Sequence, residues 1–410
     1  MSGMSVPRLD PLEPTTSSIV STSTSSSRSS PSSRSTLPSS TSSLPRSSVQ
    51  LTPSLVLASS PSTSSSTTPS LGLFATRPLE PGTLLFSEPP LLTCSSWRDL
   101  RATLSCSTDE TRTAFWSLAN AFPDEAEAEK GIFDTNAFAL DTHGGKYGLF
   151  RLTSRINHSC APNVKTSFVA SRGRMEVRVV RRVEEGEEVR SSYLPPGELV
   201  RLGKDERRER LEKGWGFECA CEACQREGGE EEALRAELRT ILDSLPRSFF
   251  CPLSQDPTLI LRHVSRALDL LDLLSLSPLC TSLFLLPAFK TCVLSHDTRS
   301  ARLWVRLALK VVGVVEGEGG EGWRRWESWR ERPERALERG EGGKGWAKRD
   351  LWRETREAIG DRCTGIRSRA RLARLTSFES FRRLEADEQS SGPGQGIVAR
   401  LSRLFEIVRS

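Results

Sequence analysis

The chain has no apolar run long enough to cross a bilayer. Its most apolar stretch, residues 279–294, is interrupted by Pro287 and Lys290 and is shorter than the roughly 20 residues that a membrane-spanning helix needs. The first residues, 1–30, also lack the continuous apolar core of a secretory signal peptide. We therefore expect no membrane association.

The chain also has no large excess of positive or negative charge. The 57 Lys and Arg residues nearly balance the 52 Asp and Glu residues and leave a net charge of +5, which gives little support for nucleic-acid binding. The 10 cysteines in 410 residues are too few for a disulfide scaffold. These observations predict a reduced intracellular protein, nuclear or cytoplasmic or both, that acts as a monomer and does not bind nucleic acid directly.

Composition divides the chain into five segments. Residues 1–69 are more than half serine and threonine and cannot bury enough apolar surface to offset their ordering entropy, so we expect a disordered tail. That tail is either a phosphorylated regulatory segment, a transit peptide or a solvated segment without a specific role. Residues 70–226 contain short apolar runs broken by Pro and Gly, such as 164–169, and these runs indicate strands and turns.

The remainder of the chain is predicted to be mainly helical. Apolar residues recur at helical spacing through residues 231–315. Residues 316–348 are rich in Gly, Glu, Arg and Trp and indicate a linker, with residues 349–410 forming C-terminal helices. The tryptophans at 323, 326 and 329 indicate either a partner surface or one packed helix face, and we favour packing or disorder. The fold class predicted from these patterns is α+β.

A cluster of cysteines indicates a metal site. Cys219, Cys221 and Cys224 form a C-x-C-x-x-C pattern, and a closed structural zinc site takes four such ligands in a tetrahedron. Cys160, which ends the segment Asn157–Cys160, is the candidate for the fourth ligand. The alternatives are three unrelated cysteines or a fourth ligand from outside the chain.

Four motifs carry a family resemblance. Residues 155–163, with the sequence RINHSCAPN, and residues 183–194, an acidic turn followed by a strand ending in Tyr193, resemble the two signatures of SET-domain lysine methyltransferases. Residues 72–76 are similar to the first SET strand, and Asn136-Ala137-Phe138 is similar to the Asn-x-Phe element of SMYD-type and fungal SET proteins. The resemblance covers residues 71–224.

One module of many SMYD proteins has no counterpart here. Residues 93–130 contain two cysteines, Cys94 and Cys106, and no histidine, so the cysteine- and histidine-rich MYND finger does not fit there. The resemblance therefore indicates a SET protein without a MYND finger.

The resemblance implies a fold, a cofactor and a set of site residues. The fold is a β-rich, knot-like SET domain with a zinc-binding post-SET segment and a helical C-terminal region, and the substrate is a lysine side chain of a protein. Tyr193 is implied as the catalytic residue, and Trp215 stands where relatives often carry a channel-lining tyrosine. The implied S-adenosylmethionine ligands are Gly72, Asn136, Asn157, His158 and Phe217. The implied zinc ligands are Cys160, Cys219, Cys221 and Cys224.

Two functions are compatible with these motifs. The first is an S-adenosylmethionine-dependent protein-lysine methyltransferase acting on a histone or another protein. The second is an inactive SET-fold module that docks peptides, because Ser70 replaces the first glycine of the family's Gly-x-Gly. The combination of Tyr193, Asn157 and His158 favours the enzyme, because a docking groove does not need these polar groups.

Overall fold

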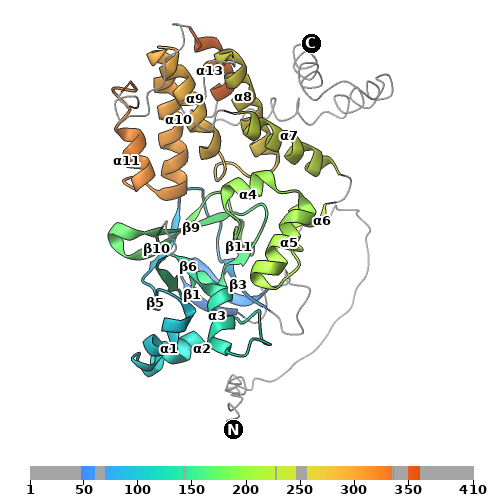
Figure 1. Cartoon of the computed structure of the whole chain (residues 1–410), viewed down its shortest axis with the longest axis vertical. Helices are drawn as coiled ribbons and strands as arrows, with labels where there is room; N and C mark the ends of the chain where they lie inside the picture. Colours follow the sequence, from blue (N-terminus) through green and yellow to red (C-terminus); the bar gives the residue numbers. More distant parts are fainter. Residues whose placement is uncertain are drawn as a thin grey trace, which may run out of the picture. The chain divides into compact units, whose positions relative to one another are not determined.

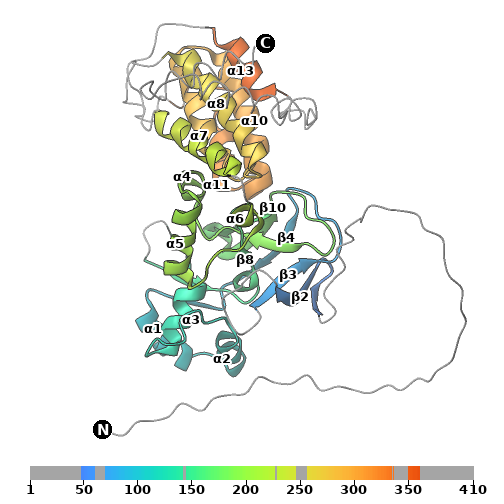
Figure 2. The same cartoon turned by 90° about the vertical axis from the view of Figure 1, so that its right-hand side faces the viewer.

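The structure is a computed structural model that describes residues 48–60, 70–141, 145–226, 229–245, 256–334, 336 and 350–360. The predicted tail over residues 1–47 and the predicted helices beyond residue 360 lie outside the described residues. Figures 1 and 2 show the β-strands gathered in one part of the described chain and the long C-terminal helices bundled in another.

A five-stranded sheet carries the Asn-His segment. Its strands follow the order β1-β2-β3-β11-β8, with β8 parallel to β11 and the other neighbours antiparallel. Arg190 of β11 is in register with Asn157 of β8. The strands of this sheet are β1 (Ser48–Thr52), β2 (Leu55–Ser60), β3 (Ser70–Ala75), β8 (Asn157–His158) and β11 (Glu188–Ser191).

The sheet corrects the predicted start of the folded region. Residues 48–60, assigned to the disordered tail, form the β1–β2 hairpin that pairs with β3. Leu55 and Val56 are buried, at 1% and 3% exposure. The hairpin therefore buries apolar side chains, which stabilises it, although residues 1–69 as a whole contain too few apolar residues to fold. Two strands, β1 and β2, therefore precede β3 within the serine-rich sequence.

Two smaller sheets and a helical insert complete the β-rich part. One sheet has the order β4-β10-β9 and the other β5-β7-β6. Helices α1 to α3 lie between β5 and β6 in the chain and pack around Leu100, Phe115 and Ile132. The bounds are β4 (Leu84–Glu88), β5 (Leu92–Cys94), α1 (Trp97–Ser105), α2 (Asp109–Trp116), α3 (Ala128–Asn136), β6 (Phe138–Ala139), β7 (Tyr147–Leu149), η1 (Thr153–Arg155), β9 (Val164–Val169), η2 (Ala170–Arg172) and β10 (Arg174–Val179).

The chain after β11 is helical. Helices α7 to α10 share one core with Cys160, Cys219, Cys221 and Cys224, since buried side chains from Cys160 to Ile359 form a single apolar cluster. The bounds are α4 (Pro196–Arg201), α5 (Lys204–Trp215), α6 (Glu222–Gln225), α7 (Glu230–Ser244), α8 (Pro257–Leu273), α9 (Ser282–Leu294), α10 (Thr298–Glu316), α11 (Glu321–Glu327) and α13 (Trp352–Ile359).

The predicted linker at residues 316–348 contains a packed helix. Helix α11 begins at Glu321, and the ring of Phe289 on α9 lies 5.3 Å from Trp326 and 5.1 Å from Trp329. Such aromatic contacts add to the burial of large apolar area. The linker assignment is therefore wrong for the described residues up to 334. Of the two alternatives for the tryptophans, the structure shows packing. Residues 337–349 lie outside the described part.

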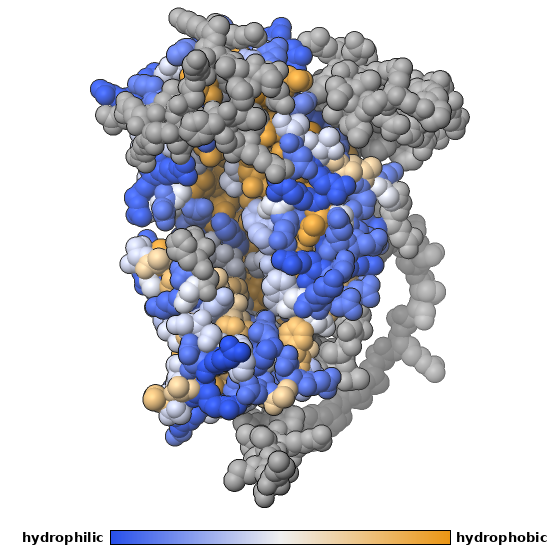
Figure 3. Space-filling view, in the orientation of Figure 1, coloured by the Kyte–Doolittle hydropathy of each residue, from blue (hydrophilic) through white to orange (hydrophobic). Residues whose placement is uncertain are grey.

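Hydrophilic residues cover most of the face drawn in Figure 3, and hydrophobic ones show mainly in a hollow in the upper half of that view. Among the helices that the structure describes, none combines the length and the apolar character needed to cross a membrane.

Candidate functional site

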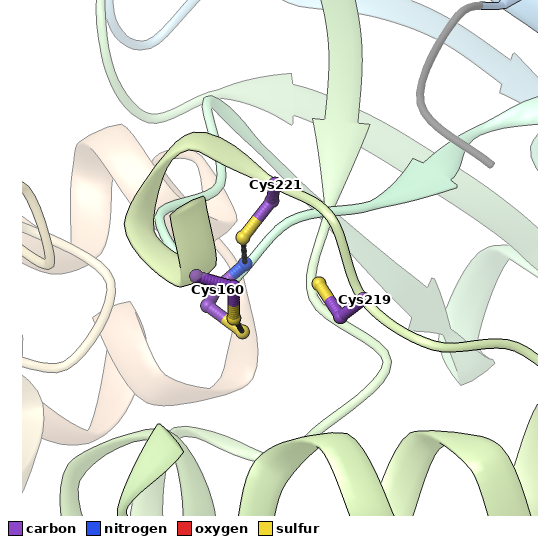
Figure 4. Close-up of side chains that lie close together, drawn as sticks. Cys160, Cys219 and Cys221 are labelled. Atoms are coloured by element: carbon purple, nitrogen blue, oxygen red, sulfur yellow. Dashed lines mark hydrogen bonds between the residues drawn. The ribbon is translucent and has the colours of Figure 1, made fainter. Parts of the chain in front are cut away.

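The structure brings the four predicted cysteines together. Cys160 follows β8, Cys219 and Cys221 follow α5, and Cys224 lies on α6. Their sulfur atoms all lie within 4.8 Å of one another, and all four residues are at most 2% exposed. Figure 4 shows Cys160 from one stretch of chain close to Cys219 and Cys221 from another.

The donor set fits a closed zinc site. Tetrahedral Zn–S bonds of about 2.3 Å place the sulfur atoms about 3.8 Å apart, and the Cys160 and Cys224 sulfurs are 3.6 Å apart. The backbone N–H of Cys160 also donates to the Cys221 sulfur at 3.4 Å, a bond that would support a thiolate. Hydrogen bonds from the other three thiols lower the pKa of Cys221. These four cysteines could hold a metal ion.

His158 links this cluster to Tyr193. Its Nδ1 accepts the backbone N–H of Tyr193 at 3.0 Å, and its Nε2 lies 3.4 Å from the Cys160 sulfur. Burial lowers the pKa of His158 to about 4, so the imidazole is neutral near pH 7. With Nδ1 accepting, the proton of the neutral ring is on Nε2 and points at the sulfur.

The Tyr193 hydroxyl is held by the segment that precedes the Asn-His pair. It donates to the carbonyl oxygen of Ile156 at 3.0 Å. Burial raises the pKa of Tyr193 above its ordinary value, so the phenol stays protonated. Its one proton is used by Ile156, and its lone pairs remain available as acceptors.

Aromatic rings surround Tyr193. Its ring centroid lies 5.3 Å from that of Trp215 and 6.1 Å from that of Phe217, and Phe217 lies 6.1 Å from His158. Gly216 between the two rings has a φ of +69°, and a Cβ there would lie 3.0 Å from the Ala121 carbonyl oxygen. A glycine therefore lets the chain turn sharply after α5 and bring Phe217 beside Tyr193.

Asn157 on β8 and Gly72 on β3 lie close together, although β11 separates their strands in the sheet order. The amide nitrogen of Asn157 donates to the Leu71 carbonyl oxygen at 3.1 Å and to the Glu188 carboxylate at 2.7 Å. A Cβ added at Gly72 would lie 3.1 Å from that amide nitrogen. Two of the predicted cofactor ligands thus adjoin each other.

Asn136 is placed differently from the other predicted cofactor ligands. It ends α3, is buried, and donates its amide N–H groups to the carbonyl oxygens of Ala119 and Ile132 at 2.7 and 2.8 Å. The bonds recorded for it within the described chain stay inside the insert. Its prediction as a cofactor ligand stays a prediction.

A cavity lies beside the helical insert, and Tyr193, Trp215 and Phe217 do not line it. It has a volume of about 440 Å³ and lies between the helical insert and the end of α5, where Gly214 directly precedes Trp215. Its wall is formed by Phe122, Glu125, Lys130, Phe133, Asp134, Ala137, Tyr147, Lys213 and Gly214.

Comparisons with known proteins identify the family. The SET domain family model matches residues 70–194. The histone-lysine N-methyltransferase set5 of Schizosaccharomyces pombe is 30% identical over 248 residues, which are 60% of this chain and 76% of that relative. The chain belongs to the SET-domain family of protein-lysine methyltransferases.

Two further SET relatives match over shorter stretches. The human protein-lysine N-methyltransferase SMYD4 is 38% identical over 80 residues, or 20% of this chain and 10% of that protein. The histone-lysine N-methyltransferase SET5 of Saccharomyces cerevisiae is 32% identical over 113 residues, or 27% of this chain and 20% of that protein.

Sequence reasoning missed the burial of several charged residues, among them Glu188 within the matched SET range and Arg207 beyond it. Glu188 is 5% exposed and contacts Asn157. The sequence identifies the acidic turn as a signature. It does not show which glutamate of the turn points inward, because that depends on strand pairing. Arg207 of α5 is fully buried and donates to the Leu202 carbonyl oxygen and the Glu232 carboxylate. It stands in a continuously charged run that reads as a solvated helix, so the sequence carries no signal for its burial.

Proposed function

We propose that this SET protein transfers a methyl group from S-adenosylmethionine to a lysine side chain of a protein. The observation that carries the proposal is the direct bond between His158 and the backbone of Tyr193, which joins the two SET signatures at one point beside Phe217. The names of the relatives support lysine as the acceptor, and those of the yeast relatives support a histone as the first substrate to test.

The residues around this point fit the proposed cofactor. Asn157 and His158 lie on β8, Phe217 supplies a ring face for an adenine, and Gly72 lies on β3, with β11 between β3 and β8. The bound cofactor supplies an activated methyl group on a sulfonium. We propose Asn157, His158 and Phe217 as its contacts, with Asn136 supporting them from the insert.

Tyr193 would orient the lysine nitrogen. The phenol donates its only proton to Ile156, so its lone pairs can accept an N–H of the amine and direct the nitrogen lone pair at the methyl group. Because it stays protonated, Tyr193 acts by orientation and not as a base. Correct placement of the reacting atoms provides a large part of such a rate.

The aromatic surroundings would help to deprotonate the lysine. A free lysine has a pKa of about 10.4, so reaching the neutral amine at pH 7 costs roughly 4.6 kcal/mol. The rings of Trp215 and Phe217 beside Tyr193 would shield a bound lysine from water, and burial favours the neutral form of a lysine. The amine would therefore lose its proton more easily than in water.

The metal site would have a structural function. Four cysteines fill a tetrahedron and leave no open position for a substrate. A zinc ion there would fasten the segment after α5, with Trp215 and Phe217, to the loop after β8. The alternative of a non-catalytic docking module has no support from the comparisons.

Methyl transfer tests the proposal. Purified protein is incubated with labelled S-adenosylmethionine and histones, and Tyr193→Phe is compared with Tyr147→Phe, which alters the other tyrosine of the chain. We expect label in lysines with the wild type and Tyr147→Phe, and a strong decrease with Tyr193→Phe. Folded, zinc-loaded wild-type protein that neither binds the cofactor nor labels histones or a cell extract would contradict the proposal.

A further inference from the structure

Glu188 is the centre of a buried polar network in the five-stranded sheet. One carboxylate oxygen accepts the Asn157 amide at 2.7 Å. The other accepts the Ser60 hydroxyl at 2.9 Å and two nitrogens of Arg190 at 2.9 and 2.6 Å. At 5% exposure, this carboxylate is held by groups from β2, β8 and its own strand β11, and a buried charge of this kind needs such partners.

Gly72 provides the space for this carboxylate. A Cβ added at Gly72 would lie 2.3 Å from the Glu188 carboxylate oxygen, closer than any real contact. Gly72 is not among the glycines with a positive φ, so its backbone does not require glycine. The tightest contact at position 72 is therefore with the carboxylate on the neighbouring strand, followed by the Asn157 amide nitrogen at 3.1 Å.

The network also determines which atom of the Asn157 side-chain amide is available to bind a ligand. Both N–H groups of an amide nitrogen are used when it donates to the Leu71 carbonyl oxygen and to Glu188. The carbonyl oxygen of Asn157 has no recorded bond within the described chain. An amide held in this way offers an acceptor, which suits the ammonium group of the cofactor's amino-acid part.

We infer that Glu188 is a positioning residue that holds the Asn157 amide in the orientation that binds the cofactor, and that Gly72 is glycine in order to house the Glu188 carboxylate. The inference rests on the proposed function.

Cofactor titration of single variants tests the first half. Binding of S-adenosylmethionine is measured by calorimetry, together with the melting temperature and zinc content of each protein. Glu188→Ala should raise the Kd about tenfold, the effect of losing one good hydrogen bond. Glu188→Gln keeps an acceptor for Asn157 and should restore most of the affinity. Glu176, also buried beside arginines but on β10, provides the control, and Glu176→Gln should bind as the wild type does.

A double variant tests the second half. Gly72→Ala should weaken binding about as much as Glu188→Ala, because the new methyl displaces the carboxylate. Glu188→Asp withdraws the carboxylate by one methylene while keeping its charge for Arg190, so it serves if Glu188→Ala does not fold. The double variants Gly72→Ala/Glu188→Ala and Gly72→Ala/Glu188→Asp should then bind no more weakly than the variants of Glu188 alone.

The outcomes separate the two proposals. Additive losses in the double variants would overturn the inference, because they would show that Gly72 faces the cofactor directly. Unchanged affinity in folded Glu188→Ala or Glu188→Asp would overturn it as well. A wild-type protein that does not bind the cofactor would instead contradict the proposed function.

Discussion

The imidazole of His158 bridges Tyr193 and Cys160: Nδ1 accepts the tyrosine backbone N–H at 3.0 Å, and Nε2 lies 3.4 Å from the cysteine sulfur. One imidazole therefore contacts both the proposed catalytic residue and the cysteine cluster. A change in either partner is expected to be felt by the other.

Replacement of His158 should affect stability and the metal site together. His158→Ala leaves the part-buried Tyr193 N–H without this partner, which costs about 1 kcal/mol of unfolding free energy. It also removes a group that contacts a ligand sulfur, so a chelator should extract zinc faster. Urea unfolding and the rate of zinc release measure both effects. His296→Ala, at an exposed position, should change neither, and an unaltered zinc release rate in His158→Ala would contradict the link.

Loss of one cluster cysteine should remove the metal. Cys221→Ser replaces one of four buried sulfurs, and three remaining thiolates hold zinc much more weakly. We expect less than one zinc per protein by elemental analysis and faster proteolysis around residues 216–226. The exposed Cys106 offers the control Cys106→Ser, which should retain the metal. Full zinc content in Cys221→Ser would exclude this cysteine as a ligand.

The β1–β2 hairpin should contribute to the stability of the SET core. Leu55 is 1% exposed and belongs to the same apolar cluster as Leu73 and Val189. Leu55→Ala should lower the free energy of unfolding by about 2–5 kcal/mol. Leu84→Ala, at a position 41% exposed, should cost much less. Equal effects of the two substitutions in urea titrations would show that the hairpin is not part of the core.

The pH dependence of stability should reveal the burial of Lys165. Its ammonium group on β9 lies 3.8 Å from Glu316 of α10 and is 27% exposed, and burial lowers its pKa while Glu316 opposes the shift. Between the lowered pKa and the ordinary value, the unfolded chain binds more protons, so stability increases with pH there. Lys165→Met should remove this increase.

Urea titrations of both proteins between about pH 7 and about pH 10 measure the difference. The advantage of Lys165→Met over the wild type should be largest at the lower pH and should shrink as pH rises. A constant difference across the range would contradict the lowered pKa.

Local sequence patterns predicted those elements whose partners are close in the chain or chemically distinctive. The strand at residues 164–169 has the predicted bounds. The meeting of the four cysteines could be predicted because their spacing is distinctive of a metal site. The hairpin at residues 48–60 was missed because its burial depends on β3 and not on its own serine-rich composition. The role of Glu188 was missed because its contact with Asn157 crosses 31 residues of chain.

The close fit between Gly72 and Glu188 also constrains how this protein can evolve. A single change at position 72 to any residue with a side chain meets a steric barrier while glutamate occupies position 188. A smaller residue at position 188 lowers this barrier, but by the inference above it also weakens cofactor binding, so the two positions are expected to change together. Across SET proteins that share this strand register, these two positions should therefore covary.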